Sequence, residues 1–295
     1  MDSKLNVLLS QMFIRLFSYN QIISDELYNQ ILFFLRTGRR ADIRHPKTFN
    51  EYILNRKVFA DEDELTVYTD KYEVREYVRR VIGSEYLVNN YGVWDHFEDI
   101  DRDALPQGFV LKATHGSGWN VIVKDKDAMN WDVVCNRFSS ALKSNYYNKS
   151  RERNYKNIVP RLICEELLVP NTSKGLIDFK VFCFWGKSQF FSVNYSESNK
   201  AYHGLFFSDG RPIPIRNRYH NIQDDFFLHQ RELLNSLAEK LASPFEFVRV
   251  DFYLCDSRIY FSELTFHSGG GIVPIEPPSV NLMLGSFFEG KQKEE

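Results

Sequence analysis

The stretch Phe109-Val-Leu-Lys-Ala-Thr-His-Gly-Ser-Gly118 begins as a short apolar strand and carries a lysine into a loop that contains two glycines. A second stretch, Phe247-Val-Arg-Val-Asp-Phe-Tyr-Leu254, is an apolar strand pattern that Arg249 and Asp251 interrupt. Charged groups buried without partners cost several kcal/mol, so a functional site explains this pair better than an ordinary strand does. A third stretch, Tyr260-Phe-Ser-Glu-Leu-Thr265, adds a second carboxylate. Together the three stretches indicate a site for a metal-bound polyphosphate.

The composition predicts a globular protein with a sizeable core. The chain has 295 residues, of which 43% are hydrophobic and 15% aromatic, which fits one large unit with two or three lobes. Its 37 basic and 39 acidic residues give a formal net charge of -2, so no global field attracts nucleic acid or an anionic membrane. We therefore expect no nucleic-acid partner, and partners must be recognised locally.

Cysteine usage and hydropathy predict a reduced, cytoplasmic protein. The four cysteines, Cys135, Cys164, Cys183 and Cys255, are scattered without a C-x-x-C pair, which argues against a disulfide framework or a zinc site. The sequence contains no run of about 18 apolar residues, and its start lacks the pattern of a secretory signal. We expect no membrane span, while a peripheral membrane association and the oligomeric state stay open.

The first 60 residues are predicted to be a helical region. Residues 4 to 36 place apolar side chains at helical spacing, which favours two helices. The first helix could lie on a membrane surface or a partner, but packing against the body is favoured because only two basic residues occur there. Thr48-Phe-Asn-Glu51 is a capping box that predicts a helix to about Phe59. Asp70-Lys-Tyr-Glu73 predicts a further helix from about 71 to 82 in the same way.

From residue 109 onward the pattern changes to strands. Short apolar runs joined by tight turns, such as Trp185-Gly-Lys-Ser188 and Cys255-Asp-Ser-Arg258, indicate antiparallel hairpins more than a doubly wound parallel sheet. The fold class is therefore predicted as α+β. The predicted strands are 109–113, 121–124, 161–168, 178–185, 189–195, 247–254 and 258–263, with helices at about 131–143 and 226–242.

Two well-known nucleotide-binding signatures do not match this sequence. Trp185-Gly-Lys-Ser188 lacks the earlier glycine of a P-loop, because Val181 stands there, and the loop after Lys112 lacks Rossmann spacing. The glycines of that loop, taken alone, fit a hairpin turn equally well. Asp99-Ile-Asp-Arg-Asp103 matches the D-x-D pattern of metal-dependent glycosyltransferases, but acidic loops contain such matches freely. A solvated loop is the favoured interpretation of this stretch.

Eight short segments occur in an order that resembles the ATP-grasp superfamily and, over nearly the whole chain, its TupA-like branch, which is linked to teichuronopeptide and surface-polysaccharide synthesis. The segments are His45–Glu51, Thr69–Arg75, Leu111–Gly118, Arg151–Lys156, Cys164–Glu166, Asp178–Lys180, Phe247–Asp251 and Phe261–Thr265. The resemblance implies an ATP-grasp fold, in which two antiparallel-sheet lobes with flanking helices hold ATP under a mobile glycine loop. It implies four regions: the helical region 1–60, a pre-ATP-grasp segment 61–106, a small lobe with the glycine loop 107–169, and a large lobe with the metal and acceptor site 170–295.

The resemblance also implies which residues bind the nucleotide. Lys71 and Lys112 would neutralise phosphate oxygens, backbone groups at residues 165–167 would contact adenine, and Asp178 would accept from ribose hydroxyls. An exposed acidic strand end is the alternative interpretation for either glutamate of that segment. The full nucleotide-binding set is Lys71, Lys112, His115, Gly116, Ser117, Gly118, Glu165, Glu166, Leu167, Asp178 and Lys180.

A metal site and two catalytic residues follow from the same resemblance. Asp251 and Glu263 would bind Mg, because hard oxygen ligands on neighbouring strands can bridge the ion to phosphates. Thr265 stands where many relatives carry asparagine, and its hydroxyl is a poorer ligand than an amide oxygen. Arg249 and Lys112 would be catalytic, with Arg249 stabilising the transferring phosphoryl group.

Two clusters are candidates for the acceptor site. Their residues are Arg151, Arg153, Lys156, His267, Gly269 and Gly270. The first three form a basic cluster, preceded by two tyrosines, that could hold an anionic sugar or amino acid, or could equally be a solvated face. The last three belong to a glycine-rich stretch whose backbone would approach the acceptor closely. This stretch departs from the proline-containing form common in the branch, which leaves the substrate undefined.

The resemblance implies an ATP- and Mg-dependent ligase that joins a small-molecule carboxylate to an amine or sugar acceptor through an acyl phosphate, adding an amino acid or similar group during capsular or cell-surface polysaccharide synthesis. Such chemistry needs positioning and charge neutralisation more than a side-chain nucleophile. His115, His203 and His267 are candidates for proton transfer, although a lone histidine more often hydrogen-bonds a loop. The alternatives are a glycosyltransferase that uses a nucleotide sugar at Asp99–Asp103 and a non-catalytic ATP-binding module.

Overall fold

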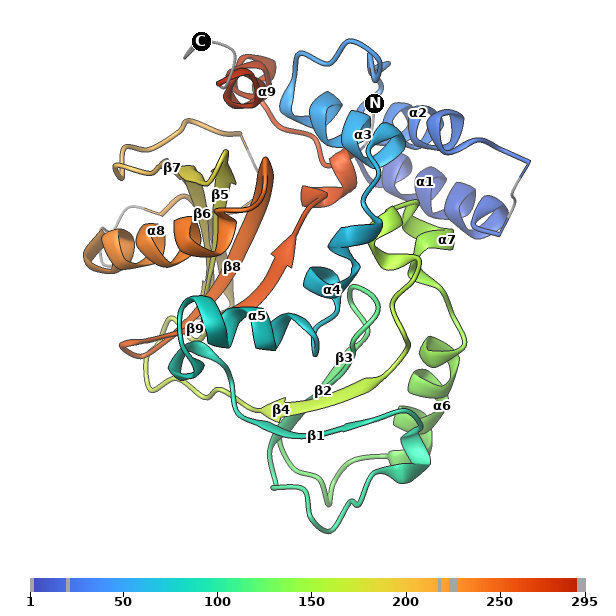
Figure 1. The fold of residues 1–295 in the computed structure, drawn as a ribbon, viewed down its shortest axis with the longest axis vertical. Coiled ribbons are helices and arrows are strands. Elements are labelled where there is room, and N and C mark those ends of the chain that lie inside the picture. Colours follow the sequence, from blue (N-terminus) through green and yellow to red (C-terminus); the bar gives the residue numbers. More distant parts are fainter. Residues whose placement is uncertain (1–2, 20–21, 217–218, 223–227, 291–295) are drawn as a thin grey trace.

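The computed structural model describes residues 3–19, 22–216, 219–222 and 228–290. Within these residues, two antiparallel sheets are joined and flanked by helices (Figure 1). The larger sheet has the strand order β7-β6-β5-β8-β9, and the smaller sheet has the order β1-β4-β2-β3. The predicted α+β class, with two antiparallel-sheet lobes and a helical N-terminal region, is confirmed.

The larger sheet is built mainly from hairpins. Its strands are β5 (Ile177–Phe184), β6 (Lys187–Glu197), β7 (Lys200–Phe207), β8 (Phe247–Cys255) and β9 (Arg258–Thr265). Tight hairpin turns need positive φ angles, and these occur at Trp185 and Gly186 between β5 and β6 and at Asp256 between β8 and β9. The two predicted hairpins are therefore present, and the Gly-Lys-Ser match is a turn.

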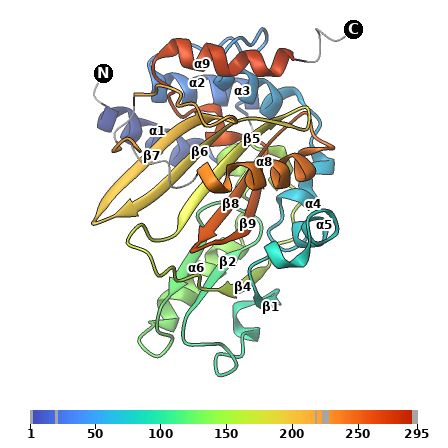
Figure 2. The ribbon, with the colours of Figure 1, turned by 90° about the vertical axis from the view of Figure 1, so that its left-hand side faces the viewer.

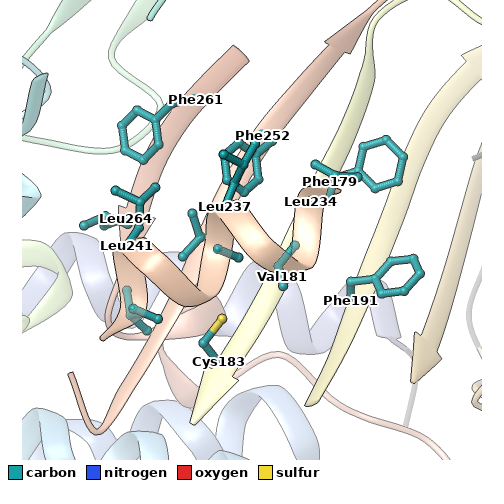
Figure 3. Packing of buried hydrophobic residues seen from close by; sticks show 14 of the residues in the cluster. Phe179, Val181, Cys183, Phe191, Leu234, Leu237, Leu241, Phe252, Phe261 and Leu264 are labelled. Atoms are coloured by element: carbon teal, nitrogen blue, oxygen red, sulfur yellow. The ribbon is translucent and has the colours of Figure 1, made fainter. Parts of the chain in front are cut away.

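One face of the larger sheet forms a hydrophobic core. Side chains alternate across a strand, so Phe179, Val181 and Cys183 point to the same face, which α8 (Leu228–Ala242) covers (Figure 3). Each such buried side chain contributes about 1.5–3 kcal/mol relative to exposure. The helix supplies the buried residues Leu234, Leu237 and Leu241. This core fixes the strands whose other face carries the site.

The opposite face of the same strands is aromatic at one end and polar toward the other. At one end, Phe182 and Phe190 pack with Phe49 of α3 (Phe49–Phe59), and α9 (Pro278–Gly285) adds Val280 and Leu284 to this aromatic core. Figure 2 shows α9 and α3 at this end of the sheet. Toward the other end, alternation along the strands places polar residues on this face, namely Asp178, Lys180, Asn194, Arg249, Asp251 and Glu263. The site is therefore expected on the polar half.

The smaller sheet has its own core. Its strands are β1 (Asn90–Trp94), β2 (Phe109–Ala113), β3 (Asn120–Val123) and β4 (Leu162–Glu166). Phe109 and Leu111 of β2 pack in a buried cluster with Phe138 of α6 (Trp131–Leu142). β1 lies within the predicted 61–106 segment and forms an edge of this sheet. The four predicted domain boundaries stay predictions.

The N-terminal region is helical, with α1 (Ser3–Phe17) and α2 (Asp25–Thr37) preceding α3. The capping box at the start of α3 is complete: the Thr48 side chain accepts from the Glu51 amide, and the Glu51 carboxylate accepts from the Thr48 amide. The next predicted helix, α5 (Val74–Val81), begins later than expected. Asp70 accepts from the amides of Tyr72 and Glu73, which form a turn before the first residue of α5.

Shorter helices complete the fold. They are α4 (Thr66–Thr69), α7 (Tyr146–Ser150) and 3-10 helices at Asp63–Leu65, Ser84–Tyr86, Phe97–Asp99, Arg153–Tyr155, Ser268–Gly271 and Ser286–Glu289. Among the described residues, none of the helices combines the length and the apolar character that a membrane crossing needs. Cys135, Cys164, Cys183 and Cys255 are all free in the structure.

Candidate active site

Strand register brings the predicted site residues of the larger sheet into adjacent positions. Lys180 of β5 pairs with Asp251 of β8, which pairs with Glu263 of β9, and Arg249 pairs with Thr265 in the next row. Because residues i and i+2 of a strand face the same side, these five side chains share one face. Three strands therefore present cations and carboxylates at neighbouring points.

Arg249 and Asp251 form a two-pronged ion pair. Arg249 Nε lies 2.7 Å from one carboxylate oxygen, and Nη2 lies 2.6 Å from the other. Lys180 Nζ is 3.2 Å from the same carboxylate and 2.6 Å from Asp178. Burial opposes the charge of Arg249, but Asp251 and Glu263 raise its pKa overall. The fork holds the guanidinium in one orientation, which is a requirement for stabilising developing charge.

Glu263 is surrounded by positive charge. Its carboxylate lies 3.9 Å from Lys71 Nζ and 3.7 Å from Arg249. Burial acts to raise the pKa of Glu263, but Lys71, Arg249 and Lys180 together lower it below its usual value. The Thr265 hydroxyl donates to Glu263 at 3.2 Å and accepts from Arg249 at 3.0 Å. Glu263 is therefore an ionised carboxylate that Thr265 orients.

The Asp251 and Glu263 carboxylates form a donor set that suits Mg. This ion is commonly bound by one or two carboxylates together with phosphate oxygens and water, so two neighbouring carboxylates are sufficient. Thr265 suits it less well, because its hydroxyl already bonds Arg249 and Glu263. Within the described residues, no group of three or more His, Cys, Asp and Glu side chains could hold a metal ion. A bound Mg would thus need phosphate oxygens and water to complete its coordination.

The smaller sheet contributes a second ion-paired group. Lys112 Nζ on β2 lies 2.6 Å from one oxygen of Glu165, and Arg75 lies 2.8 Å from the other. Arg75 also donates to a backbone carbonyl at 2.7 Å, which fixes its side chain. Burial opposes the charge of Lys112, but Glu165, Tyr253 and Glu263 raise its pKa overall. Tyr253 and Glu263 belong to the larger sheet, so groups of both sheets influence the pKa of Lys112.

The segment predicted to contact adenine covers the end of β4. The Glu165 side chain is engaged with the two cations just described, and the Glu166 amide donates to the Asn89 carbonyl at 2.9 Å. Leu167 comes directly after the last residue of β4. Leu167 is thus the first residue of this segment beyond the strand, and the adenine contact stays a prediction.

The glycine loop joins β2 to β3 and is held by Lys71. The Lys71 ammonium donates to the Gly116 carbonyl at 2.7 Å, and Gly118 adopts a φ of 75°, a left-handed conformation that favours glycine. Burial lowers the pKa of Lys71, although Glu263 opposes this effect. Lys71 therefore connects the loop of the smaller sheet to a carboxylate of the larger sheet, and the predicted phosphate and metal residues converge.

The other polar side chains of the loop contact α6 and α7. His115 is buried, with Nε2 2.9 Å from the Ala141 carbonyl, and burial lowers its pKa. Ser117 hydrogen-bonds the side chain of Tyr146. The neutral imidazole of His115 thus supports the loop, and nucleotide contacts by His115 and Ser117 stay predictions.

The basic cluster predicted for the acceptor has other partners. Arg151 and Lys156 line a separate pocket of ≈ 360 Å³ together with Asp25 and Tyr147. Arg151 lies 3.4 Å from Asp25, and the Lys156 ammonium lies over the Tyr147 ring. Arg153 begins a 3-10 helix. In the described part of the chain these residues thus contact α2 and α7, and Arg151 also donates to the carbonyls of residues 17 and 18 at the end of α1. A role in acceptor binding stays a prediction.

His267 is enclosed between two carboxylates. Its Nε2 lies 2.9 Å from Glu62, and its Nδ1 lies 3.6 Å from Glu152. Burial opposes the charge of His267, but Glu62 and Glu152 raise its pKa overall, which favours the imidazolium. Gly269 and Gly270 follow with positive φ angles in a 3-10 helix. The side chain of His267 therefore anchors the glycine-rich turn, whose contact with an acceptor stays a prediction.

Three site residues were not identified from the sequence. Arg75 holds Glu165, Ser268 accepts from Arg249 at 3.0 Å, and Asn194 accepts from His203 Nδ1 at 2.7 Å. Arg75 lies in a segment that carries the family resemblance, which was an available signal. Asn194 and Ser192 alternate with Phe191, Val193 and Tyr195, which places the two polar residues on one face. Ser268 lies within the glycine-rich stretch 267–271, which was considered for its backbone and not for this hydroxyl.

The D-x-D stretch is an exposed turn. The Asp101 carboxylate accepts from the amides of Asp103 and Ala104 at 3.1 Å and 3.4 Å. Asp99, Asp101 and Asp103 are all exposed. The structure thus agrees with the solvated loop that the sequence favours.

Comparisons with known proteins found one matching family model and several similar solved structures. A model of the TupA-like ATP-grasp family matches residues 51–289. Among solved structures, D-alanine–D-alanine ligase from Bacillus anthracis complexed with ATP is 14% identical with a TM-score of 0.42, covering 78% of this chain and 70% of that chain. The ATP-grasp ligase PsnB complexed with minimal precursor is 12% identical with a TM-score of 0.43, covering 78% and 62%.

A third solved structure, D-alanine–D-alanine ligase from Helicobacter pylori, is 10% identical with a TM-score of 0.41, covering 76% of this chain and 58% of that chain. The chain thus spans less than two thirds of the PsnB and Helicobacter pylori chains. No curated protein matches. The family match covers most of the chain and confirms the predicted fold class and the predicted enzyme class, an ATP-grasp ligase: this protein belongs to the TupA-like ATP-grasp family.

Proposed function

We propose that this chain is an ATP- and Mg-dependent ligase that joins a carboxylate to an amine through an acyl phosphate. The observation that carries the proposal is the position of Lys71. Its ammonium lies 2.7 Å from the Gly116 carbonyl of the smaller sheet's loop and 3.9 Å from Glu263 of the larger sheet. Phosphate-binding cations and metal-binding carboxylates are therefore neighbours, as phosphoryl transfer from ATP requires.

The nucleotide would lie between the two sheets. Lys71 and Lys112 would bind its phosphate oxygens, exchanging their present partners Gly116 and Glu165 for phosphate. Amides of the glycine loop would add further donors to the terminal phosphates. Asp178 of β5, whose carboxylate now pairs with Lys180, would accept from a ribose hydroxyl.

Asp251 and Glu263 would hold Mg, and Thr265 would orient Glu263. When bound, Mg neutralises charge on phosphate oxygens. Arg249, fixed by Asp251 and Ser268, would donate to the transferring phosphoryl group. An interaction of this kind is strongest when charge develops on the phosphoryl oxygens, so it accelerates the reaction instead of only binding the substrate.

The reaction balances without a protein nucleophile. A substrate carboxylate oxygen attacks the terminal phosphorus of ATP, and the bond to the bridging oxygen breaks so that ADP leaves. The amine then attacks the acyl carbon, phosphate leaves with the electrons of the carbon–oxygen bond, and the amine loses a proton. Arg249 and Lys112 supply positive charge beside the transferring group, and the two sheets supply its position.

The setting that we propose is the assembly of a capsular or cell-surface polysaccharide in the cytoplasm, where the ligase would add an amino acid or a similar group. Membership of the TupA-like family supports this setting. The pocket beside Arg249 has a volume of ≈ 350 Å³, which suits a small-molecule substrate.

ADP release tests the proposal. Lys112→Ala, Asp251→Asn and Glu263→Gln are each expected to abolish ADP release over a panel of carboxylates and amines while retaining the thermal unfolding of the parent. Hydroxylamine in place of the amine should trap the acyl phosphate as a hydroxamate. Glu232→Gln, a change at an exposed glutamate, is the matched control and should keep full activity.

Near-parental turnover in all three variants would mean that the site is assigned to the wrong residues. Release of a nucleoside diphosphate from a sugar nucleotide, without a need for ATP, would instead support the glycosyltransferase. Nucleotide binding without ADP release for any substrate pair would support a non-catalytic module.

A further inference from the structure

A pocket of ≈ 350 Å³ lies on the same face of the larger sheet, directly beside Arg249. Strands β5, β6 and β7 form one wall, and residues 268–276 form the opposite wall. Two lining residues, Lys180 and Arg249, also belong to the proposed phosphoryl-transfer site. A third lining residue, His203, lies on β7. Cavities of this size fall at the small end of ligand pockets, so one small molecule fits beside the transferring phosphate.

The end of the pocket nearest the metal carboxylates is cationic. Lys180 and Arg249 both line it, and Arg249 is held in place by Asp251 and by the Ser268 hydroxyl at 3.0 Å. A carboxylate at this end would accept charge-assisted hydrogen bonds from two fixed cations. It would also lie next to the group that we expect to stabilise the phosphoryl transfer, so this end suits the carboxylate that receives phosphate.

The other end of the pocket offers a hydrogen-bond acceptor. His203 Nδ1 lies 2.7 Å from Asn194 Oδ1, an oxygen that can only accept, so Nδ1 carries the proton. Burial lowers the pKa of His203, and the charge of Lys180 adds to this effect, so the imidazole is neutral. Nε2 then presents a lone pair, and within the described part of the chain no residue donates a hydrogen bond to it.

One side of the pocket is apolar. Phe182 and Phe190 stack with ring centroids 4.3 Å apart, and Leu205 and Ile275 also line this part. His203 and Lys180 lie on strands separated by two spacings, roughly 9–10 Å between backbones. Ser192, which pairs with Lys180, and Asn194, which pairs with His203, lie between them on β6. The side chains of His203 and Lys180 shorten this gap, so the space between them suits a single ring or a short chain.

Building on the proposed ligase function, we infer that this pocket selects a small carboxylate that carries a hydrogen-bond donor, a hydroxyl or an amino group, at the end remote from its carboxylate. The carboxylate faces Lys180 and Arg249, the ring or chain lies over Ser192 with Phe182 and Phe190 to one side, and the remote donor bonds His203 Nε2. His203 is then a specificity residue, and Asn194 is the positioning residue that fixes its tautomer.

Paired probes test this inference by equilibrium binding to the full chain in the presence of ADP and Mg. Each pair compares a carboxylate that has a remote donor with one that lacks it: quinate with cyclohexanecarboxylate, hydroxyphenylacetate with phenylacetate, and gamma-aminobutyrate with butyrate. We expect at least one donor-bearing probe to bind about tenfold or more tightly than its partner. His203→Ala should remove this preference by weakening the donor-bearing probe alone.

Two further variants make the result specific. His203→Gln retains a hydrogen-bond acceptor and should restore part of the preference. His229→Ala changes an exposed histidine of α8 and should leave the preference unaltered. Absence of binding by every probe, or a preference that survives His203→Ala, would overturn the inference.

Failure of the ligase proposal would look different. Probes that bind with the expected preference, yet yield no ADP with any amine, would leave the pocket assignment standing and reject the ligase. ADP release whose KM for the carboxylate is the same in His203→Ala and the parent would leave the ligase standing and reject the pocket assignment.

Discussion

Two clusters of charged residues in this protein contain similar side chains but differ in role, since one is proposed to bind ligands and the other stabilises the fold. The cleft cluster consists of Lys71, Lys112, Lys180, Arg249, Asp251 and Glu263, and the buried cluster consists of Lys57, Glu62, Glu152 and His267. The Glu263 side chain is 33% exposed, whereas that of His267 is 0% exposed and that of Glu62 is 3% exposed. A partly exposed ion pair can exchange its partner for a ligand, and a fully enclosed one holds the fold. Asp251 of the cleft cluster is also only 2% exposed, so the contrast rests on Glu263 and the three lysines, whose side chains are 16–33% exposed.

The buried cluster connects α3 to the turn that borders the pocket. Lys57 donates to the Gly270 carbonyl at 3.3 Å, and burial lowers its pKa although Glu152 opposes this effect. A Cβ added at Gly270 would lie 3.7 Å from the Lys57 ammonium. The position of the pocket wall therefore depends on side chains that no ligand needs to contact.

The sharpest test of the cleft cluster is Arg249→Ala. The variant loses the group expected to stabilise the transferring phosphoryl, so ADP release should fall by about a thousandfold or more, equivalent to about 4 kcal/mol. Steady-state ADP release and thermal unfolding measure the two effects separately. Arg211→Ala, which removes an exposed arginine paired with Asp209, is the control and should keep full activity.

If Arg249→Ala kept parental activity, the cleft cluster would have a structural role like that of the buried cluster. Side-chain exposure would then not separate binding residues from structural ones. A loss of activity that merely follows unfolding would have the same meaning.

The matching test of the buried cluster is His267→Ala. Removing the imidazolium leaves Glu62 and Glu152 enclosed without their cation, which should lower the free energy of unfolding by about 3–5 kcal/mol. Urea unfolding followed by circular dichroism measures this change. His229→Ala, at an exposed position of α8, should change it by less than about 0.5 kcal/mol. Equal stability of the two variants would contradict a structural role for His267.

The pH dependence of stability sharpens the same contrast. Because the folded protein raises the pKa of His267 above 6.5, its contribution is complete below that value and is lost as the pH rises through the folded pKa. Lys57, with a lowered pKa, acts in the opposite sense in both proteins. The stability difference between the parent and His267→Gln should therefore shrink with rising pH in urea unfolding. A difference that grows with pH would exclude a buried imidazolium.

The smallest expected effect in the cleft is that of Thr265→Val. Its hydroxyl orients Glu263 and Arg249 through single hydrogen bonds, so activity should fall by no more than about tenfold. Titration of ADP release with Mg should show nearly the parental apparent affinity. A loss as large as that of Glu263→Gln would instead make the hydroxyl a metal ligand.

Local sequence rules predicted much of the fold. The strand 109–113 and the end of the helix at Phe59 match the structure, because period-two alternation and a capping box are local signals. β1 and β7 were missed: Asn90-Tyr-Gly-Val-Trp94 is short, and Lys200–Phe207 is interrupted by His203 and Gly204. Both strands gain their pairing from neighbours, which a local pattern does not show.

The candidate site divides in the same way. Alternation alone placed Arg249 and Asp251 on one face, whereas their pairing with Lys180 and Glu263 depends on strand register. The enclosure of His267 depends on carboxylates that lie more than a hundred residues earlier in the chain. The glycines after His267 suggested a ligand contact, and nothing in the sequence indicated that the imidazole itself would be enclosed.

The double attachment of Lys71 has a mechanical consequence. The Lys71 side chain, bonded to Gly116 and close to Glu263, links the tip of the β2–β3 hairpin to the larger sheet. An anion that takes the place of the Gly116 carbonyl on this ammonium would release the hairpin at the same time. Binding of the triphosphate and release of the β2–β3 hairpin would therefore occur together.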